Sequence, residues 1–136
     1  MIKLIVGNKG SGKTKTLIRM VNETAASSNG NVVCVEKGLQ LTYDISHKVR
    51  LVDIGEYKIQ GFDCLYGFLG GLMAGNYDIT DVFVDATLKI GGRDMDALAA
   101  MMEKAAALAG EHKVNLIFTI SAGASELPES LKQYMI

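Results

Sequence analysis

A glycine-rich turn between an apolar run and a helical pattern constrains this chain more than any other segment. Residues 7–14 read Gly-Asn-Lys-Gly-Ser-Gly-Lys-Thr, a full match to the pattern GxxxxGK[ST]. Apolar residues at positions 2 and 4–6 precede the turn, and apolar residues at helical spacing follow it. Glycines let the backbone curl so that several N–H groups face inward at the positive end of a helix, where they form a nest for an anion. The sequence therefore predicts a strand, a phosphate-binding loop and a helix, in that order.

Two side chains at the end of this turn carry the expected chemistry. Lys13 would reach the β- and γ-phosphates of a nucleoside triphosphate, and the Thr14 hydroxyl would bind Mg²⁺. The residues expected to hold the nucleotide are Gly7, Asn8, Lys9, Gly10, Ser11, Gly12, Lys13, Thr14 and Lys15. A chance turn rich in glycine and lysine is the alternative, and the strand–loop–helix context argues against it.

Size and composition fit one domain spanning residues 1–136, because a chain of 136 residues can build a single core but not two. A net charge of −1 gives no electrostatic reason to bind nucleic acid or an anionic membrane. The apolar stretches are too short or too interrupted to span a bilayer, and the first strand runs directly into the loop, unlike a cleavable signal peptide. We therefore expect a cytoplasmic protein. Cys34 and Cys64 belong to no CxxC pair, which excludes a zinc ribbon and favours two buried, small apolar side chains.

Strand-like and helix-like segments alternate along the chain, which predicts a three-layer α/β sandwich with a mainly parallel central sheet. Core strands are expected at 2–6, 32–36, 82–85 and 114–120. One helix should begin at Lys13, and a second should run from an Asp94 cap through Ala109 with Gly110 ending it. A short C-terminal helix is expected to start within residues 125–129 and to dock through Leu127, Leu131 and Tyr134.

Two middle segments are less regular. Apolar and polar residues alternate over 39–45, and 49–54 is rich in β-formers, so the two could form a hairpin joined at residues 46–48. A loop followed by one further sheet strand is the open alternative. Residues 62–74 are apolar but contain several glycines, so a helix there implies close packing against a neighbouring backbone, in the core or at a subunit interface.

A second candidate site element is the apolar run 82–84 that ends in Asp85. A carboxylate at the end of a buried strand, downstream of a phosphate loop, would orient Mg²⁺ directly or through water. Asp85 is therefore the expected metal residue together with Thr14, whereas Asp81 before the strand is a turn or cap residue.

With these two motifs the chain resembles the P-loop NTPase superfamily over nearly its whole length. Within it, the chain looks most like the RecA-like branch and resembles small stand-alone bacterial ATP-binding proteins. The resemblance implies a further strand between the phosphate-loop strand and the strand that ends in Asp85. It also implies a polar sensor near the γ-phosphate, for which Thr119 and Ser121 are the two candidates.

The chain departs from many such ATPases after the magnesium acid, where Ala86 and Thr87 replace the glutamate that polarises the attacking water. Some RecA-like enzymes take this base from the end of the second strand, where Glu36 stands, with a solvated turn residue as its other interpretation. Arg93 is the first candidate for a cation that stabilises the developing charge, acting within the chain or across a subunit contact. Arg50 is the second. The expected catalytic set is thus Lys13, Glu36 and Arg93.

The sequence leaves three functions open. The first is an ATP-binding protein, with Mg²⁺ as cofactor, that hydrolyses ATP slowly or when a partner stimulates it. The second is a nucleotide-dependent switch or assembly module without turnover, with residues 62–74 as the surface for a protein partner or a second copy. The third is a small-molecule kinase of the nucleoside type, ranked last because the zinc ribbon and arginine-rich lid of such kinases are missing. ATP is preferred because no guanine-reading Asn/Thr-Lys-x-Asp element is present.

Overall fold

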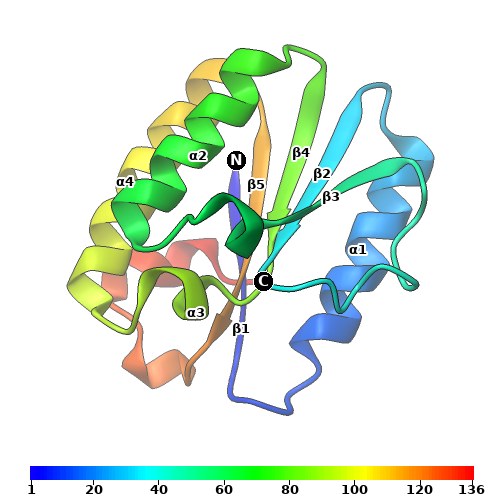
Figure 1. The fold of residues 1–136 in the computed structure, drawn as a ribbon. Helices are drawn as coiled ribbons and strands as arrows, with labels where there is room; N and C mark the ends of the chain where they lie inside the picture. Colours follow the sequence, from blue (N-terminus) through cyan, green and yellow to red (C-terminus); the bar gives the residue numbers. More distant parts are fainter.

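Five parallel strands form one sheet in the computed structural model, which describes all residues 1–136. The strands are β1 (Ile2–Gly7), β2 (Asn31–Glu36), β3 (Val49–Asp53), β4 (Ile79–Val84) and β5 (Asn115–Ser121). Their order is β1-β5-β4-β2-β3 and every pairing is parallel, so all five carboxyl ends lie at one end of the sheet (Figure 1). The inserted strand that the resemblance implied is β5, between β1 and β4.

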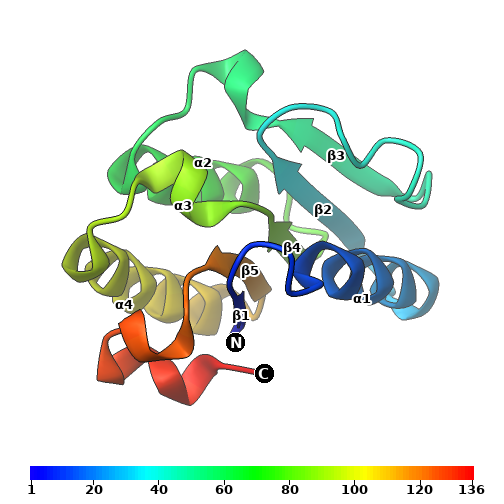
Figure 2. The ribbon, with the colours of Figure 1, turned by 90° about the horizontal axis from the view of Figure 1, so that it is seen from below.

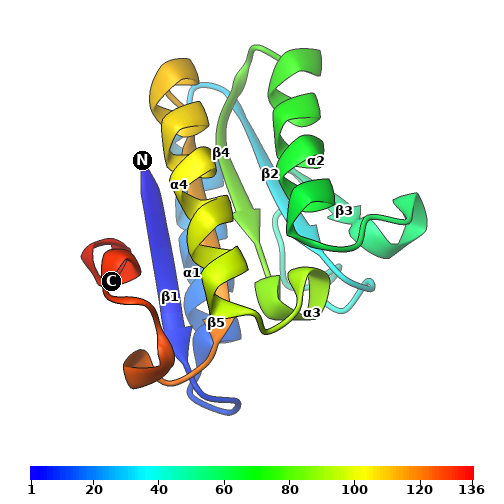
Figure 3. The ribbon, with the colours of Figure 1, turned by 90° about the vertical axis from the view of Figure 1, so that its left-hand side faces the viewer.

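Helices cover both faces of this sheet and complete the predicted three layers. They are α1 (Lys13–Ser27), α2 (Phe62–Gly75), α3 (Thr87–Gly91) and α4 (Met95–His112), with 3₁₀ segments at Ile54–Tyr57, Ala124–Glu126 and Glu129–Tyr134. α1 lies on one face, and α2 and α4 lie on the other (Figures 2 and 3). Each long helix buries an apolar stripe at helical spacing, such as Leu17 and Val21 on α1 and Leu98, Met102 and Ala105 on α4. The predicted α/β fold class is confirmed.

The segment between β2 and β3 is a loop that leads into one further sheet strand, which is the second of the two expected arrangements, and the hairpin over residues 39–54 is wrong. β3 pairs in parallel with β2, with Val32 opposite Val49 and Val35 opposite Val52. Within the loop, Leu41 and Ile45 are buried in the apolar cluster between α1 and the sheet. Their alternation with polar residues thus reflects one helix-like turn, closed by a bond from the Ile45 N–H to the Leu41 carbonyl, and not a strand.

The long helix α4 begins where predicted and ends later than predicted. The Asp94 carboxylate caps it by accepting bonds from the N–H groups of Asp96 and Ala97. The helix continues through Gly110 to His112, because the left-handed residue that stops it is Lys113, with φ 56°. Its N–H donates to the Ala109 carbonyl, which satisfies the helix end without a glycine.

The glycines of α2 do not pack against a neighbouring backbone, contrary to the expectation from the sequence. A Cβ built at Gly67, Gly71 or Gly75 would meet no atom within 4 Å, and at Gly70 only the Leu108 side chain at 3.9 Å. Gly67, Gly71 and Gly75 are exposed because α2 buries its other side through Phe62, Leu65, Leu69 and Met73. An interface role for this side of α2 stays a prediction.

The two cysteines differ in their surroundings. Cys34 is fully buried in β2, as predicted, whereas Cys64 is exposed on α2, so that half of the prediction is wrong. Position 64 lies between the buried positions 62 and 65, and the helical period turns it toward solvent.

The C-terminal residues pack against β1, which is an edge strand of the sheet (Figure 3). Leu127 and Leu131 are buried as predicted, but two 3₁₀ segments replace the one expected helix: Leu127 follows the first segment and Leu131 lies in the second. Met135 pairs with Leu4 in a parallel bridge, and the Ile136 N–H donates to the Leu4 carbonyl. No helix of the protein is long and apolar enough to cross a membrane.

Candidate nucleotide-binding site

The phosphate loop connects the carboxyl end of β1 to the first turn of α1. Gly10 and Gly12 have φ values of 85° and 91°, in the left-handed region that glycine tolerates without strain. Position 7 favours glycine because a Cβ there would clash with Ser11, whose hydroxyl oxygen would lie 2.2 Å away. No side chain caps α1 at Gly12, so the first-turn N–H groups are available to an anion.

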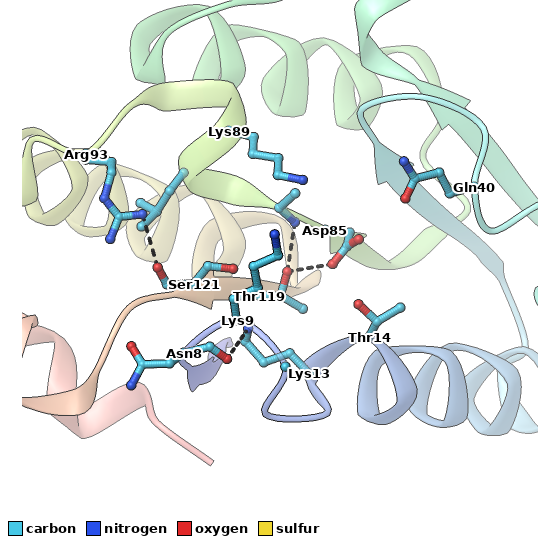
Figure 4. Close-up of a pocket in the computed structure, with 13 residues that line it drawn as sticks. Asn8, Lys9, Lys13, Thr14, Gln40, Asp85, Lys89, Arg93, Thr119 and Ser121 are labelled. Carbon is cyan, nitrogen blue, oxygen red and sulfur yellow. Dashed lines mark hydrogen bonds between the residues drawn. The ribbon is translucent and has the colours of Figure 1, made fainter.

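Lys13 and Thr14 follow the loop on the first turn of α1 and face the same cavity (Figure 4). The Lys13 ammonium donates a 3.0 Å hydrogen bond to the Asn8 carbonyl, across the turn. The Thr14 side chain is exposed and lines the cavity opposite Asp85. Lys15 is exposed and does not line the cavity, so only part of the nine-residue predicted set faces it directly.

Asp85 stands immediately after β4, and a hydrogen bond ties it to β5. The Thr119 hydroxyl donates to Asp85 Oδ1 at 2.7 Å and accepts from the Ala86 N–H at 2.8 Å. Thr119 is buried, with 1% of its surface exposed, so this bond ties the partly buried carboxylate to the core. Ser121, the other sensor candidate, also lines the cavity at the end of β5.

The cavity has a volume of about 720 Å³ and lies at the carboxyl ends of the strands. Its charged lining residues are four cations and one acid: Lys9, Lys13, Lys89, Arg93 and Asp85. The remaining lining residues are Asn8, Gly10, Thr14, Gln40, Ala86, Leu88, Thr119 and Ser121. An excess of positive charge around one carboxylate suits a polyanion that carries a divalent cation.

Arg93 reaches this cavity from the segment after α3, as the sequence predicted. Its guanidinium donates to the Ser121 carbonyl at 3.2 Å and lies 3.7 Å from a carboxylate oxygen of Glu126. Both side chains of this ion pair are more than half exposed, so the pair holds Arg93 weakly and leaves it free to turn. Arg50 lies elsewhere, on the exposed side of β3, in a separate groove with Lys48.

Glu36 ends β2 and is buried, with 3% of its surface exposed. It does not line the cavity; its two carboxylate oxygens accept hydrogen bonds from the N–H groups of Gln40 and Leu41, at 3.0 and 3.2 Å. Burial raises the pKa of the Glu36 carboxyl and these two bonds oppose the rise, while the nearby charges of Asp85 and Asp53 add to it. The role of general base for Glu36 stays a prediction.

Two polar cavity residues escaped the sequence analysis. Lys89 reaches the site because Ala86 adopts a left-handed conformation, with φ 55°, that turns the chain from β4 directly into α3. Gln40 reaches it from the loop after β2. Neither residue belongs to a recognisable motif, and no local signal in the sequence marks an alanine for positive φ.

Comparison with known proteins supports the fold and nothing finer. No family model matches the chain, and no curated protein is similar to it. Among solved structures, the flagellar accessory protein FlaH from Methanocaldococcus jannaschii is similar with a TM-score of 0.56 and 19% sequence identity. The similarity covers 97% of this chain and 65% of FlaH, so this chain spans just under two thirds of that protein.

The FlaH similarity does not support the resemblance to bacterial ATP-binding proteins in particular, since that neighbour is archaeal. The strand order and the structural similarity agree on the architecture. The chain has a RecA-like P-loop fold.

Proposed function

We propose that this protein binds Mg-ATP in the cavity at the carboxyl end of the sheet and hydrolyses it slowly or under stimulation by a partner. The observation that carries the proposal is the convergence of the phosphate loop with the Asp85–Thr119 pair on one cavity with an excess of cations. The triphosphate would lie along the loop and the N-terminus of α1, with Lys13 on its β- and γ-phosphates.

The donor set facing the cavity fits Mg²⁺. Mg²⁺ binds to proteins through one or two oxygen ligands and takes its remaining ligands from water and from substrate phosphates. The Thr14 hydroxyl and the Asp85 carboxylate, on opposite walls of the cavity, are such ligands. The protein contains no cluster of three or more His, Cys, Asp or Glu that would suit a different metal site.

Arg93 and Lys89 would stabilise the charge that develops on the transferred phosphoryl group. Both line the cavity from the α3 side, opposite the phosphate loop. Arg93 is held only by the exposed ion pair with Glu126 and an exposed hydrogen bond to the Ser121 carbonyl, both of which it could exchange for bonds to a bound phosphate.

A non-hydrolysing nucleotide switch is the second candidate. It is favoured by the position after Asp85, where Ala86 uses its N–H to bind Thr119 and supplies no side chain that could activate water. The two functions share the binding site and differ in turnover.

Calorimetric binding of Mg-ATP and phosphate release, measured on the same purified sample, test the proposal. The Lys13→Ala protein is the negative variant, and Lys48→Ala is its matched control because Lys48 is exposed and lies outside the cavity. Lys13→Ala removes the hydrogen bonds from the Lys13 ammonium to the phosphates, which should weaken Mg-ATP binding by about 3 kcal/mol, roughly 100-fold. The circular dichroism spectrum of this variant should be unchanged. Equal affinities of wild type and Lys13→Ala would refute the proposed site. Binding of Mg-ATP without phosphate release would favour the non-hydrolysing switch over the ATPase.

A further inference from the structure

The loop of residues 37–48 crosses from β2 to β3 beside the cavity, and side chains from outside the loop fasten it. Near its start, the Gly38 N–H donates to a carboxylate oxygen of Asp53 at 2.8 Å. Near its end, the Asn22 side chain on α1 accepts from the Ser46 N–H and donates to the Asp44 carbonyl, at 2.8 and 2.9 Å. The loop is therefore attached both to the end of β3 and to the helix that follows the phosphate loop.

The centre of the loop is attached through Glu36. Its buried carboxylate binds the N–H groups of Gln40 and Leu41, and the Leu41 side chain lies in the core with Ile45. A carboxylate that accepts two backbone N–H bonds fixes both peptide groups in one orientation, because each bond is directional. Glu36 thereby fixes the position of the Gln40 backbone, from which the Gln40 side chain extends.

That side chain points into the nucleotide cavity. Figure 4 shows the Gln40 amide projecting from the loop toward Asp85, on the wall that faces the phosphate loop. Two other large side chains of this loop are exposed without lining the cavity: Leu39 is 61% exposed and Tyr43 is fully exposed. Gln40 is the one residue of this loop that lines the cavity.

We propose that Gln40 binds the terminal phosphate of the nucleotide or the water next to it, and that Glu36 is the positioning residue that holds Gln40 there. The inference rests on the proposed function and deepens it, because it names the group that distinguishes a triphosphate from a diphosphate. An amide suits this role because its NH₂ donates to a phosphoryl oxygen and its carbonyl accepts from a water molecule. An amide cannot take up the proton of that water, so the contact orients the water without acting as a base.

The test compares the affinities of the protein for Mg-ATPγS and Mg-ADP by calorimetry, since neither measurement requires turnover. Wild type should bind Mg-ATPγS more tightly than Mg-ADP. In Gln40→Ala the ratio of the two affinities should fall about five- to tenfold, the value of one net hydrogen bond. Its affinity for Mg-ADP should stay within roughly twofold, because ADP lacks the contacted phosphate. Gln60→Ala is the matched control, since Gln60 is exposed and lies outside the cavity.

Glu36→Gln tests the positioning role. A glutamine keeps one acceptor oxygen and turns an NH₂ group toward the second N–H, so one of the two bonds is lost. The affinity ratio should fall as in Gln40→Ala, and the amides of Gln40 and Leu41 should exchange hydrogen faster. Glu111→Gln, on an exposed turn of α4, should change neither quantity. A Glu36 that acts only as a base would leave the ratio at the wild-type value in Glu36→Gln, which would overturn the positioning role.

The outcomes separate this inference from the proposed function. Wild type that binds neither nucleotide would overturn both. Wild type that binds both nucleotides equally, or a Gln40→Ala protein that keeps the wild-type ratio, would overturn the inference and leave nucleotide binding intact. Because Gln40 is exposed and its side chain makes no hydrogen bond within the protein, Gln40→Ala folds regardless of the fate of Glu36→Gln.

Discussion

The hydroxyl of Thr119 donates a 2.7 Å hydrogen bond to the Asp85 carboxylate and accepts a 2.8 Å bond from the Ala86 N–H. The Thr119 side chain on β5 thus forms hydrogen bonds with both the Asp85 carboxylate, which follows β4, and the peptide N–H of the next residue. Because Thr119 is buried, removing its hydroxyl leaves the Ala86 N–H without a partner in a place that water does not reach easily.

Thr119→Val should therefore lower the free energy of unfolding by about 1–3 kcal/mol. It should also weaken Mg²⁺-dependent nucleotide binding about tenfold or more, since the carboxylate loses its orienting partner. Denaturant unfolding and calorimetry with and without Mg²⁺ measure the two effects. Thr24→Val, whose hydroxyl makes no hydrogen bond, serves as the control. A variant with wild-type stability would show that the bond contributes nothing.

Asp85→Asn should reduce the affinity for Mg-ATP while leaving the affinity for metal-free ATP unchanged, because the amide is a poorer Mg²⁺ ligand than the carboxylate. The matched control is Asp81→Asn, which lies within β4 and not before it as expected, and whose carboxylate accepts a bond from Asn115. Calorimetry in Mg²⁺ and in EDTA separates the two affinities. An equal loss in both conditions would contradict the metal role of Asp85.

Native protein should react with a maleimide at Cys64 and not at Cys34. Burial raises the pKa of the Cys34 thiol to about 12, with Glu36 and Asp85 adding to the rise, so almost no thiolate forms at neutral pH. Cys64 is exposed on α2. Mass spectrometry should find one label on native protein and two on denatured protein, and rapid double labelling under native conditions would contradict the burial of Cys34.

Gly67→Ala should stabilise the protein by about 1 kcal/mol, because alanine is the better helix former and its methyl group meets no atom within 4 Å. Gly91→Ala should instead destabilise it by about 1–3 kcal/mol, since the added Cβ would lie 2.1 Å from the Phe62 ring. Thermal unfolding of both variants checks the opposite signs. If Gly67→Ala lowers the stability and also changes the mass of the protein in solution, the outward side of α2 is a subunit contact.

The stability of wild type relative to Glu36→Gln should fall as the pH rises. Burial raises the pKa of Glu36 above the ordinary value of about 4.3, so between these two values the folded state binds more protons than the unfolded state. The stability from the protonated carboxyl is therefore complete below about pH 4.3 and is lost as the pH passes the folded-state pKa. Urea unfolding of both proteins from about pH 4 to 7 isolates this contribution. A difference that rises with pH would contradict the direction of the shift.

The parts of the site that could be predicted from sequence are those carried by short local patterns. The phosphate loop is such a pattern, and Asp85 could be placed near it because parallel strands bring their carboxyl ends together. Gln40 and Lys89 could not be placed near the site from the sequence. The position of Gln40 depends on a loop held by side chains distant in sequence, and the position of Lys89 depends on the left-handed backbone of Ala86. Alternation over residues 39–45 left a strand and a loop both open, because a short run cannot distinguish a period of two from one helical turn with buried positions four apart.

The order of the strands has a consequence for how the chain folds. β1 carries the phosphate loop, yet its one neighbour in the sheet is β5, near the opposite end of the chain. During synthesis, β1 therefore gains its hydrogen-bonded partner in the sheet only after β2, β3 and β4 have also been made. Closing a contact over such a sequence distance slows folding and leaves an apolar strand edge open to other chains meanwhile. The strand that leads into the nucleotide loop is thus made well before the strand that pairs with it, so this loop is among the latest segments to be held in place.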